Sequence, residues 1–225
     1  MPKRPKRQSP ANSSNDSAGT VVEVDLRIIG GKFRGSRLAY GAHGGTEGLV
    51  TRPMKHRVRE AIFNLVGTEL SGKLALDLFA GTGALGLEAI SRGAERALFI
   101  EKHVPSANVV KQNIAALHLD DRCELRITSA MLWGKRDLPT LESQIPWAVF
   151  FSPPYRLFVE QTEEMLQLIA ALQQQAPSGS LLIIEADERF DFQQLEGQIK
   201  QTRHDDGWDI RTYQPAVVGV WRVNR

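Results

Sequence analysis

The chain has 225 residues, of which 42% are apolar and 24% charged, the proportions of a globular protein with a substantial core. No apolar stretch approaches the roughly 20 residues that span a bilayer, and the basic, Ser- and Pro-rich start is not a secretory signal. The single cysteine, Cys123, excludes an internal disulfide and favours a reducing, cytoplasmic location.

Positive charge is concentrated near the amino end. The formal net charge is +2, yet residues 1–59 carry 12 Lys and Arg against 4 Asp and Glu, a balance of +8 that leaves −6 for residues 60–225. This asymmetry indicates that a polyanion such as a nucleic acid docks at one end of the molecule. A solvated basic tail would give the same charge balance.

The amino-terminal region divides into a tail and a hairpin. Residues 1–22 lack hydrophobic periodicity and predict a disordered basic tail. Residues 23–50 predict a small β-hairpin extension, broken by a Gly-Gly pair and followed by a glycine-rich loop. The exposed hairpin positions carry four basic side chains that could face a polyanion: Arg27, Lys32, Arg34 and Arg37.

The main domain is predicted over residues 51–225. Pro53 begins a helical segment that runs to about residue 70. From residue 72, short apolar runs alternate with helical stretches, which is the rhythm of a parallel sheet. Strands are predicted near 74–79, 96–101, 123–128, 147–152 and 180–185, and helices near 84–92, 104–118, 157–175 and 188–199. An antiparallel hairpin, 208–213 with 216–223, ends the chain.

This order of elements predicts an α/β fold with a seven-stranded, mostly parallel sheet and a C-terminal antiparallel hairpin. The ending resembles that of the Rossmann-like class I methyltransferases, whose final strand inserts antiparallel to the others. An ordinary dinucleotide-binding domain lacks such an ending.

A glycine-rich turn joins the first strand of the main domain to the following helix. Gly81 and Gly83 would let a ligand approach the backbone, and Gly86 would let the helix pack closely on the sheet. Glu101 ends the next strand, where its carboxylate could accept hydrogen bonds from both ribose hydroxyls. This much fits NAD as well as S-adenosylmethionine. Asp77, four residues before the first glycine, favours the latter, because a carboxylate there could meet the ammonium group of an aminoacyl cofactor.

We therefore predict S-adenosylmethionine as the cofactor. Ser129 follows the third strand, where this fold presents groups to the adenine ring, although loop polarity alone explains a serine there almost as well. The predicted cofactor-binding residues are Asp77, Phe79, Ala80, Gly81, Gly83, Glu101, Lys102, Ser129 and Ala130.

The tetrapeptide Ser152-Pro153-Pro154-Tyr155 follows the buried run 147–151. Neither proline has an N–H donor and both restrict φ, so the corner holds two carbonyls and one aromatic ring in a fixed geometry. It suits gripping a planar amino group, and it resembles the (Asn/Asp)-Pro-Pro-(Tyr/Phe) signature of methyltransferases that modify exocyclic amines of nucleobases. Ser152 departs from that signature: it keeps an acceptor lone pair, on a shorter arm and without a carboxylate charge.

Over residues 26–223 the chain resembles the bacterial guanine-N2 methyltransferases of 16S ribosomal RNA, the D-type enzymes. The resemblance is carried by RIIGGKFRG at 27–35, RP at 52–53, RVREAIFN at 57–64, LDLFAGTGALGLEA at 76–89 and SRGA at 91–94. It implies that Pro153 and Ser152 accept hydrogen bonds from the amine and that Tyr155 stacks on an extruded base.

The same resemblance assigns the basic residues near the amino end to RNA. With the hairpin residues, the candidates for RNA phosphates are Arg52, Lys55, Arg57 and Arg59. Arg59 and Glu60 could instead order a lid over the cofactor site.

The sequence thus predicts a monomeric, S-adenosylmethionine-dependent methyltransferase that modifies the N2 of a guanine in 16S rRNA, free or within an assembling small subunit, without a metal. Two alternatives remain. The first, motivated by Ser152, is a degenerate methyltransferase that serves as an RNA-binding assembly factor. The second is an adenine-N6 methyltransferase acting on DNA, against which the amino-terminal hairpin and the RVRE block count.

Overall fold

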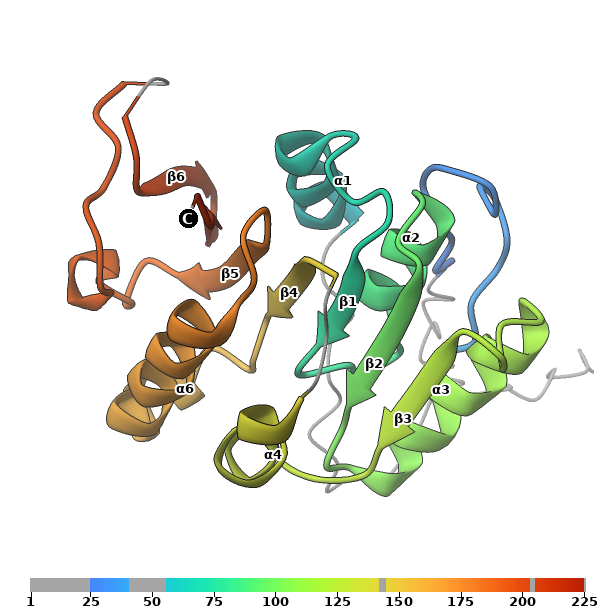
Figure 1. The fold of residues 1–225 in the computed structure, drawn as a ribbon. Helices are drawn as coiled ribbons and strands as arrows, with labels where there is room; N and C mark the ends of the chain where they lie inside the picture. Colours follow the sequence, from blue (N-terminus) through green and yellow to red (C-terminus); the bar gives the residue numbers. More distant parts are fainter. Residues whose placement is uncertain (1–24, 41–55, 142–144, 203–204, 225) are drawn as a thin grey trace, which may run out of the picture.

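The computed structural model describes residues 25–40, 56–141, 145–202 and 205–224. Within them the chain forms a seven-stranded sheet with the order β3-β2-β1-β4-β5-β7-β6 (Figure 1). The strands are β1 Leu74–Asp77, β2 Arg96–Ile100, β3 Cys123–Arg126, β4 Trp147–Phe151, β5 Leu181–Asp187, β6 Trp208–Tyr213 and β7 Ala216–Arg222. The first five are parallel, and β7 pairs antiparallel with both β5 and β6. The predicted fold class is confirmed.

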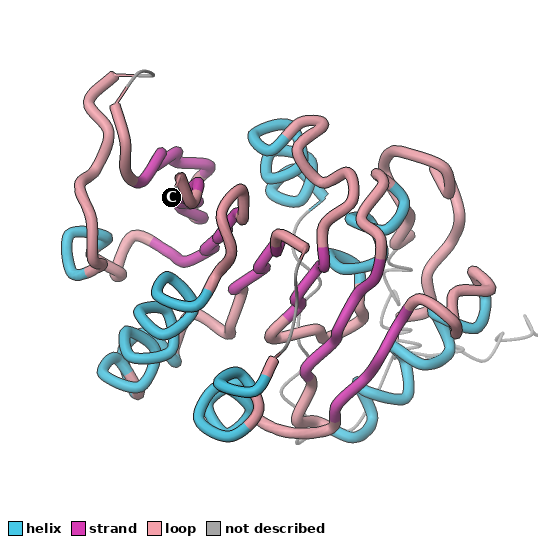
Figure 2. Tube along the Cα trace, in the orientation of Figure 1, coloured by secondary structure: helices cyan, strands magenta, loops and turns pink. Residues whose placement is uncertain are grey.

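Helices cover both faces of this sheet, as Figure 2 shows. Their bounds are α1 His56–Val66, α2 Ala84–Ser91, α3 Val104–Ala116, α4 Ala130–Arg136, α5 Leu157–Glu160 and α6 Thr162–Gln175. Side chains of α1, α2 and α3 pack in one hydrophobic cluster, and those of α4, α5 and α6 in a second. Alternate strand residues feed the two clusters: Phe150 points to the first, Val149 and Phe151 to the second. The core is therefore two layers separated by the sheet.

The strand order places a topological switch point beside β1. The chain runs from β1 outward to β2 and β3, then returns to β4 on the other side of β1. In open α/β sheets the crevice beyond the carboxyl ends of the strands, at such a reversal, is where ligands bind. The topology therefore predicts a ligand site at the loops that follow β1 and β4.

The amino-terminal segment 25–40 packs into the first hydrophobic cluster. It turns back on itself through an isolated bridge between Arg27 and Arg37, although no regular strand forms. Leu26, Ile28 and Leu38 are buried in the cluster. The rest of the predicted hairpin extension and the whole predicted tail lie outside the described residues.

Buried polar side chains hold this segment in place. The Glu88 carboxylate, on α2, accepts hydrogen bonds from the backbone N–H groups of Ile29 and Gly30 at 2.6 and 2.8 Å. Asn113, on α3, exchanges hydrogen bonds with the backbone of Ala39 and also donates to the Thr82 carbonyl at 2.9 Å. One amide side chain thus ties the amino-terminal segment to the glycine-rich turn.

Two helix predictions need correction. The helix expected over 157–175 is interrupted at Gln161, whose φ of −137° separates α5 from α6. The helix expected near 188–199 is wrong: only a short 3₁₀ turn, Phe192–Gln194, forms there. Phe192 and Leu195 are buried in the second cluster, and Gly197 adopts a φ of +99° that no right-handed helix accommodates. Conversely, α4 was not predicted, because seven residues give too little periodicity.

No described helix is both long and apolar enough to cross a membrane.

Replacing Gly86 with alanine should destabilise the fold. A Cβ atom at this position would lie 2.4 Å from the Phe99 ring, which is fully buried on β2. Such overpacking costs about 1–3 kcal/mol, more than the helix propensity that alanine adds, about 1 kcal/mol at most. Denaturant unfolding measures whether the free energy of unfolding of Gly86→Ala is lower than that of the unmodified protein. Asn108→Ala at an exposed position of α3 is the control, and equal stability of the two variants would contradict the prediction.

Candidate active site

The turn between β1 and α2 is a tight glycine loop held from several sides. Gly81 and Gly83 have φ of +56° and +78°, conformations that side-chain-bearing residues rarely adopt. The Gly83 N–H donates to the Ala80 carbonyl at 2.6 Å, and Asn113 holds the Thr82 carbonyl. These positive φ values and hydrogen bonds give the loop a defined, tight conformation.

Asp77 lies beneath this loop at the end of β1. It is 1% exposed, and its Oδ2 atom accepts a hydrogen bond from the Gly86 N–H at 3.0 Å, near the start of α2. Burial raises the pKa of Asp77 to about 7, and the nearby charge of Glu101 acts in the same direction, whereas the Gly86 hydrogen bond opposes it. A cation brought to this carboxylate would restore its charge. The aminoacyl ammonium of the predicted cofactor is such a cation.

Glu101 braces the loop from the end of β2. Its Oε2 atom accepts from the Gly81 N–H at 2.8 Å and its Oε1 from the His103 N–H at 2.7 Å. The carboxylate is half-buried at the rim, and Lys102 beside it is exposed. Because each oxygen retains a second lone pair, the group can still accept hydroxyl donors from a ribose.

The predicted adenine-side residues form the start of α4. Ser129 is its N-cap, and the Ser129 Oγ atom accepts a hydrogen bond from the Leu132 N–H at 3.1 Å. Ala130 is buried in the second hydrophobic cluster. Ser129 therefore has a structural role, and its contact with adenine stays a prediction.

The Ser152–Tyr155 corner follows β4, the strand beside β1. The Leu78 N–H donates to the Phe150 carbonyl at 3.1 Å, and the Phe79 ring meets the Phe151 ring edge-on with centroids 5.2 Å apart. The glycine loop and the corner are thus in contact through their leading residues.

Within the corner the two prolines differ. Pro153 is buried and Pro154 exposed, and the Pro154 carbonyl accepts from the Leu157 N–H at 2.8 Å to begin α5. No backbone N–H of the described residues donates to the Pro153 carbonyl. That carbonyl can serve as the acceptor expected of it.

Sequence reasoning missed Glu185, which completes the corner. This residue lies on β5, the strand next to β4, and is 5% exposed. The hydroxyls of Ser152 and Tyr155 donate to its two carboxylate oxygens, one to each. Burial raises the pKa of Glu185, although both hydroxyl hydrogen bonds oppose the shift. The available signal was an acidic residue at the end of the apolar run predicted as the strand near 180–185.

Tyr155 is affected in turn. Burial and the adjacent Glu185 charge raise the pKa of the Tyr155 phenol, so it stays a hydrogen-bond donor. Its ring is half-buried.

Four predicted RNA-binding residues are exposed: Lys32, Arg34, Arg37 and Arg57. Arg27 is partly covered and pairs with Asp25 at 2.8 Å. Arg52 and Lys55 lie outside the described residues.

Arg59 requires a correction. Its side chain is 1% exposed and its Nη2 atom donates to the Arg27 carbonyl at 2.5 Å, so it cannot present its charge to an RNA phosphate. Burial lowers the pKa of the Arg59 guanidinium. Arg59 lies beneath the amino-terminal segment, and the alternative expectation, that Arg59 and Glu60 order a lid over the cofactor site, stays a prediction.

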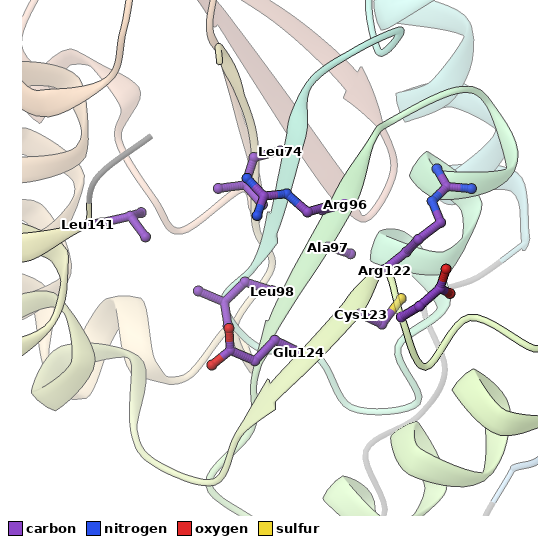
Figure 3. A pocket seen from close by; sticks show the side chains of 9 residues that line it. Leu74, Arg96, Ala97, Leu98, Arg122, Cys123, Glu124 and Leu141 are labelled. Atoms are coloured by element: carbon purple, nitrogen blue, oxygen red, sulfur yellow. The ribbon is translucent and has the colours of Figure 1, made fainter. Parts of the chain in front are cut away.

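A separate hollow of about 350 Å³ lies at the amino ends of β1, β2 and β3 (Figure 3). Arg96, Arg122 and Glu124 mix both charge signs on its wall. Burial raises the pKa of Cys123 to about 12, so its thiol stays protonated near neutral pH. This hollow is at the opposite end of the strands from the glycine loop and plays no part in the candidate site.

The parallel sheet with its antiparallel ending, the glycine loop between buried Asp77 and Glu101, and the Pro-Pro corner beside it define a class I, S-adenosylmethionine-dependent methyltransferase. The family model described as Conserved hypothetical protein 95 matches residues 26–211. The chain belongs to this family, which includes the small-subunit rRNA methyltransferases D.

Individual relatives agree with this assignment. The chain is 31% identical over 180 residues to Bacillus subtilis YlbH, a proposed rRNA methyltransferase, covering 79% of this chain and 91% of that protein. It is 33% identical over 143 residues to the ribosomal RNA small subunit methyltransferase D of Escherichia coli strain K12, covering 63% and 67%. The solved structure of Escherichia coli yhhF, a proposed methyltransferase, superposes with a TM-score of 0.64 at 25% identity, covering 88% and 98%.

Cofactor affinity should depend on pH through Asp77. Below about pH 7 this residue holds a proton in the free protein, and binding the cofactor's ammonium requires that the proton leave. Between about pH 7 and about pH 5.5 the affinity for S-adenosylmethionine should therefore fall, by up to about tenfold per pH unit. Titration calorimetry measures this slope. Asp77→Asn should bind weakly and show a flat profile, and a slope equal to that of the unmodified protein would refute the assignment.

Glu101→Gln should weaken cofactor binding, because it removes the negative charge of the group predicted to accept hydrogen bonds from the ribose hydroxyls. A hydrogen bond to a charged group contributes about 1.5–3 kcal/mol, so the dissociation constant should rise by about tenfold or more. Glu124→Gln on β3 is the matched control, since Glu124 is exposed and remote from the loop. Equal affinities of the two variants would remove Glu101 from the site.

Proposed function

We propose that the chain transfers a methyl group from S-adenosylmethionine to the exocyclic N2 of a guanine in 16S rRNA. The observation that carries the proposal is the contact of the glycine loop with the Ser152–Tyr155 corner, through Phe79 and Phe151. A base amine held by the corner would then lie beside a cofactor held by the loop. The name of the Escherichia coli relative supports the choice of small-subunit rRNA as the substrate.

Base amines need assistance because their nitrogen lone pair is delocalised into the ring. The cofactor supplies a methyl group on a positive sulfonium. The Pro153 carbonyl and the Ser152 hydroxyl accept hydrogen bonds from the amine N–H groups, which draws the nitrogen towards tetrahedral geometry. Tyr155 provides a ring on which the extruded base stacks. Orientation and electrostatics then contribute most of the rate, without a covalent intermediate.

The exposed basic side chains of the amino-terminal region would hold the RNA backbone. Lys32, Arg34 and Arg37 lie on the segment that Glu88 and Asn113 fix to the catalytic domain, and Arg57 lies on α1. Such phosphate contacts position the substrate and make its binding salt-dependent. We propose residues 23–50 as an RNA-docking extension of a monomeric enzyme, preceded by a basic tail.

Deleting the gene should remove one N2-methylguanosine from 16S rRNA. Mass spectrometry of digested 16S rRNA measures the loss, and the intact gene supplied in trans should restore the modification. Asp77→Ala, which removes the carboxylate facing the cofactor, should not restore it. An unchanged content of N2-methylguanosine in the deletion strain would rule out the proposed substrate.

Two other outcomes would identify the alternatives. Loss of N6-methyladenine from DNA would favour the DNA enzyme. A subunit-assembly defect that Asp77→Ala corrects, with no change in methylation, would favour an assembly factor without catalysis.

A further inference from the structure

We propose that Glu185 is the positioning carboxylate of the amine-binding corner and acts on the substrate through the Ser152 hydroxyl. The inference rests on the proposed function, since it concerns how the same corner methylates an amine. Ser152 and Tyr155 follow β4, whereas Glu185 lies on the neighbouring strand β5, and none of the sequence motifs includes Glu185.

The register of the sheet brings these residues together. Phe151, the last residue of β4, pairs with Ile184 of β5, so Ser152 and Glu185 are the next residues along each strand. Ser152 donates to one oxygen of the Glu185 carboxylate, and Tyr155 donates to the other. Both carboxylate oxygens are thus committed to the two side chains that the corner presents to a base.

The charge environment of Glu185 argues against a purely structural role. It is 5% exposed, and within the described part of the chain no Lys, Arg or His forms an ion pair with it. Burying a carboxylate with only neutral hydrogen-bond donors costs free energy. A glutamine or an apolar residue could fill the same buried position on β5 at lower cost. Unpaired buried acids of this kind are concentrated at functional sites.

Ser152 transmits the effect of this charge. Because its hydroxyl proton is directed to Glu185, the Oγ lone pairs are available to accept an N–H of the amine. The neighbouring negative charge polarises the O–H bond and makes Oγ a stronger acceptor. A serine backed by a glutamate can thus provide the electrostatic help that the shorter, neutral side chain lacks alone.

The same arrangement gives the released proton a destination. The amine nitrogen forms its bond to the methyl carbon as the bond from that carbon to sulfur breaks, and the electron pair of the broken bond remains on sulfur. The surplus amine proton passes to Ser152 Oγ while the Ser152 proton passes to Glu185. The products are a neutral methylamino group, a neutral thioether and a protonated Glu185, which returns its proton to solvent.

The test is a mutant cycle on the full chain. Methyl transfer from labelled S-adenosylmethionine is measured on small ribosomal subunits from the deletion strain, for Ser152→Ala, Glu185→Gln and the double variant. Glu185→Gln keeps the shape of the side chain and should lower kcat by about tenfold to a hundredfold. The double variant should be no slower than the slower single variant, because the two residues act as a unit. Cofactor affinity by calorimetry should stay within about twofold of the unmodified protein.

Moving the carboxylate should rescue the reaction. In Ser152→Asp/Glu185→Gln the charge stands at position 152 itself, and kcat should recover by about tenfold relative to Glu185→Gln. Because aspartate at position 152 is itself the signature residue, Ser152→Asp alone is measured beside it. A Glu185 that acts through Ser152 makes Glu185→Gln costly in the unmodified protein and nearly neutral in Ser152→Asp, whereas a merely structural Glu185 makes it equally costly in both. The matched control is Asp187→Asn, two residues along the same strand, whose carboxylate pairs with Arg189 at 2.7 Å.

Several results would overturn the proposal: an undiminished kcat in Glu185→Gln, additive losses in the double variant, or no recovery in Ser152→Asp/Glu185→Gln. If thermal melting shows that Glu185→Gln does not fold, Ser152→Ala decides, and a kcat within about threefold of the unmodified protein refutes the inference. Failure of the proposed function is distinguishable, because the unmodified protein would then methylate no small subunit at all.

Discussion

The hydrogen bond from the Gly86 N–H to the Asp77 carboxylate is the interaction on which the site depends. It joins the end of β1 to the start of α2, and the glycine loop must close between these two points. Gly86 makes the join possible, because any side chain there would collide with Phe99. The carboxylate is buried at the cost of a raised pKa, and a cationic ligand relieves that cost. The proposed cofactor contact would therefore use the same carboxylate that orders the loop.

A second set of buried polar groups connects the amino-terminal segment to the glycine loop. Glu88 is fully buried, and its carboxylate accepts hydrogen bonds from the backbone of the amino-terminal segment. The same carboxylate pairs with Arg92, with 2.7 Å between Glu88 Oε1 and Arg92 Nε. Asn113 contacts both that segment and the loop between Gly81 and Gly83. Because each of these groups is satisfied by backbone partners from a distant part of the chain, the basic segment is fixed relative to the glycine loop.

Much of the fold could be predicted because its signals are local. Short apolar runs spaced by amphipathic stretches indicated all seven strands, and the spacing of Asp77, Gly81 and Gly83 indicated a ligand-binding loop between a strand and a helix. The errors arose where packing overrides local preference. Phe192 and Leu195 are drawn into the core, which leaves a short turn instead of a helix over 188–199. Arg59 looked like a surface cation by its neighbours in sequence, yet α1 turns it beneath the segment of Arg27.

The sequence by itself determined the class of fold, the glycine loop and the rigid Pro-Pro corner, because each depends on residues close together in the chain and on backbone restrictions that those residues impose. Only the tertiary structure decided which residue the hydroxyls of the corner contact. Ser152 and Glu185 are 33 residues apart in sequence, and they meet because β4 and β5 pair in one particular register. Shifting that register by one residue would turn Glu185 to the opposite face of the sheet, away from Ser152 and Tyr155.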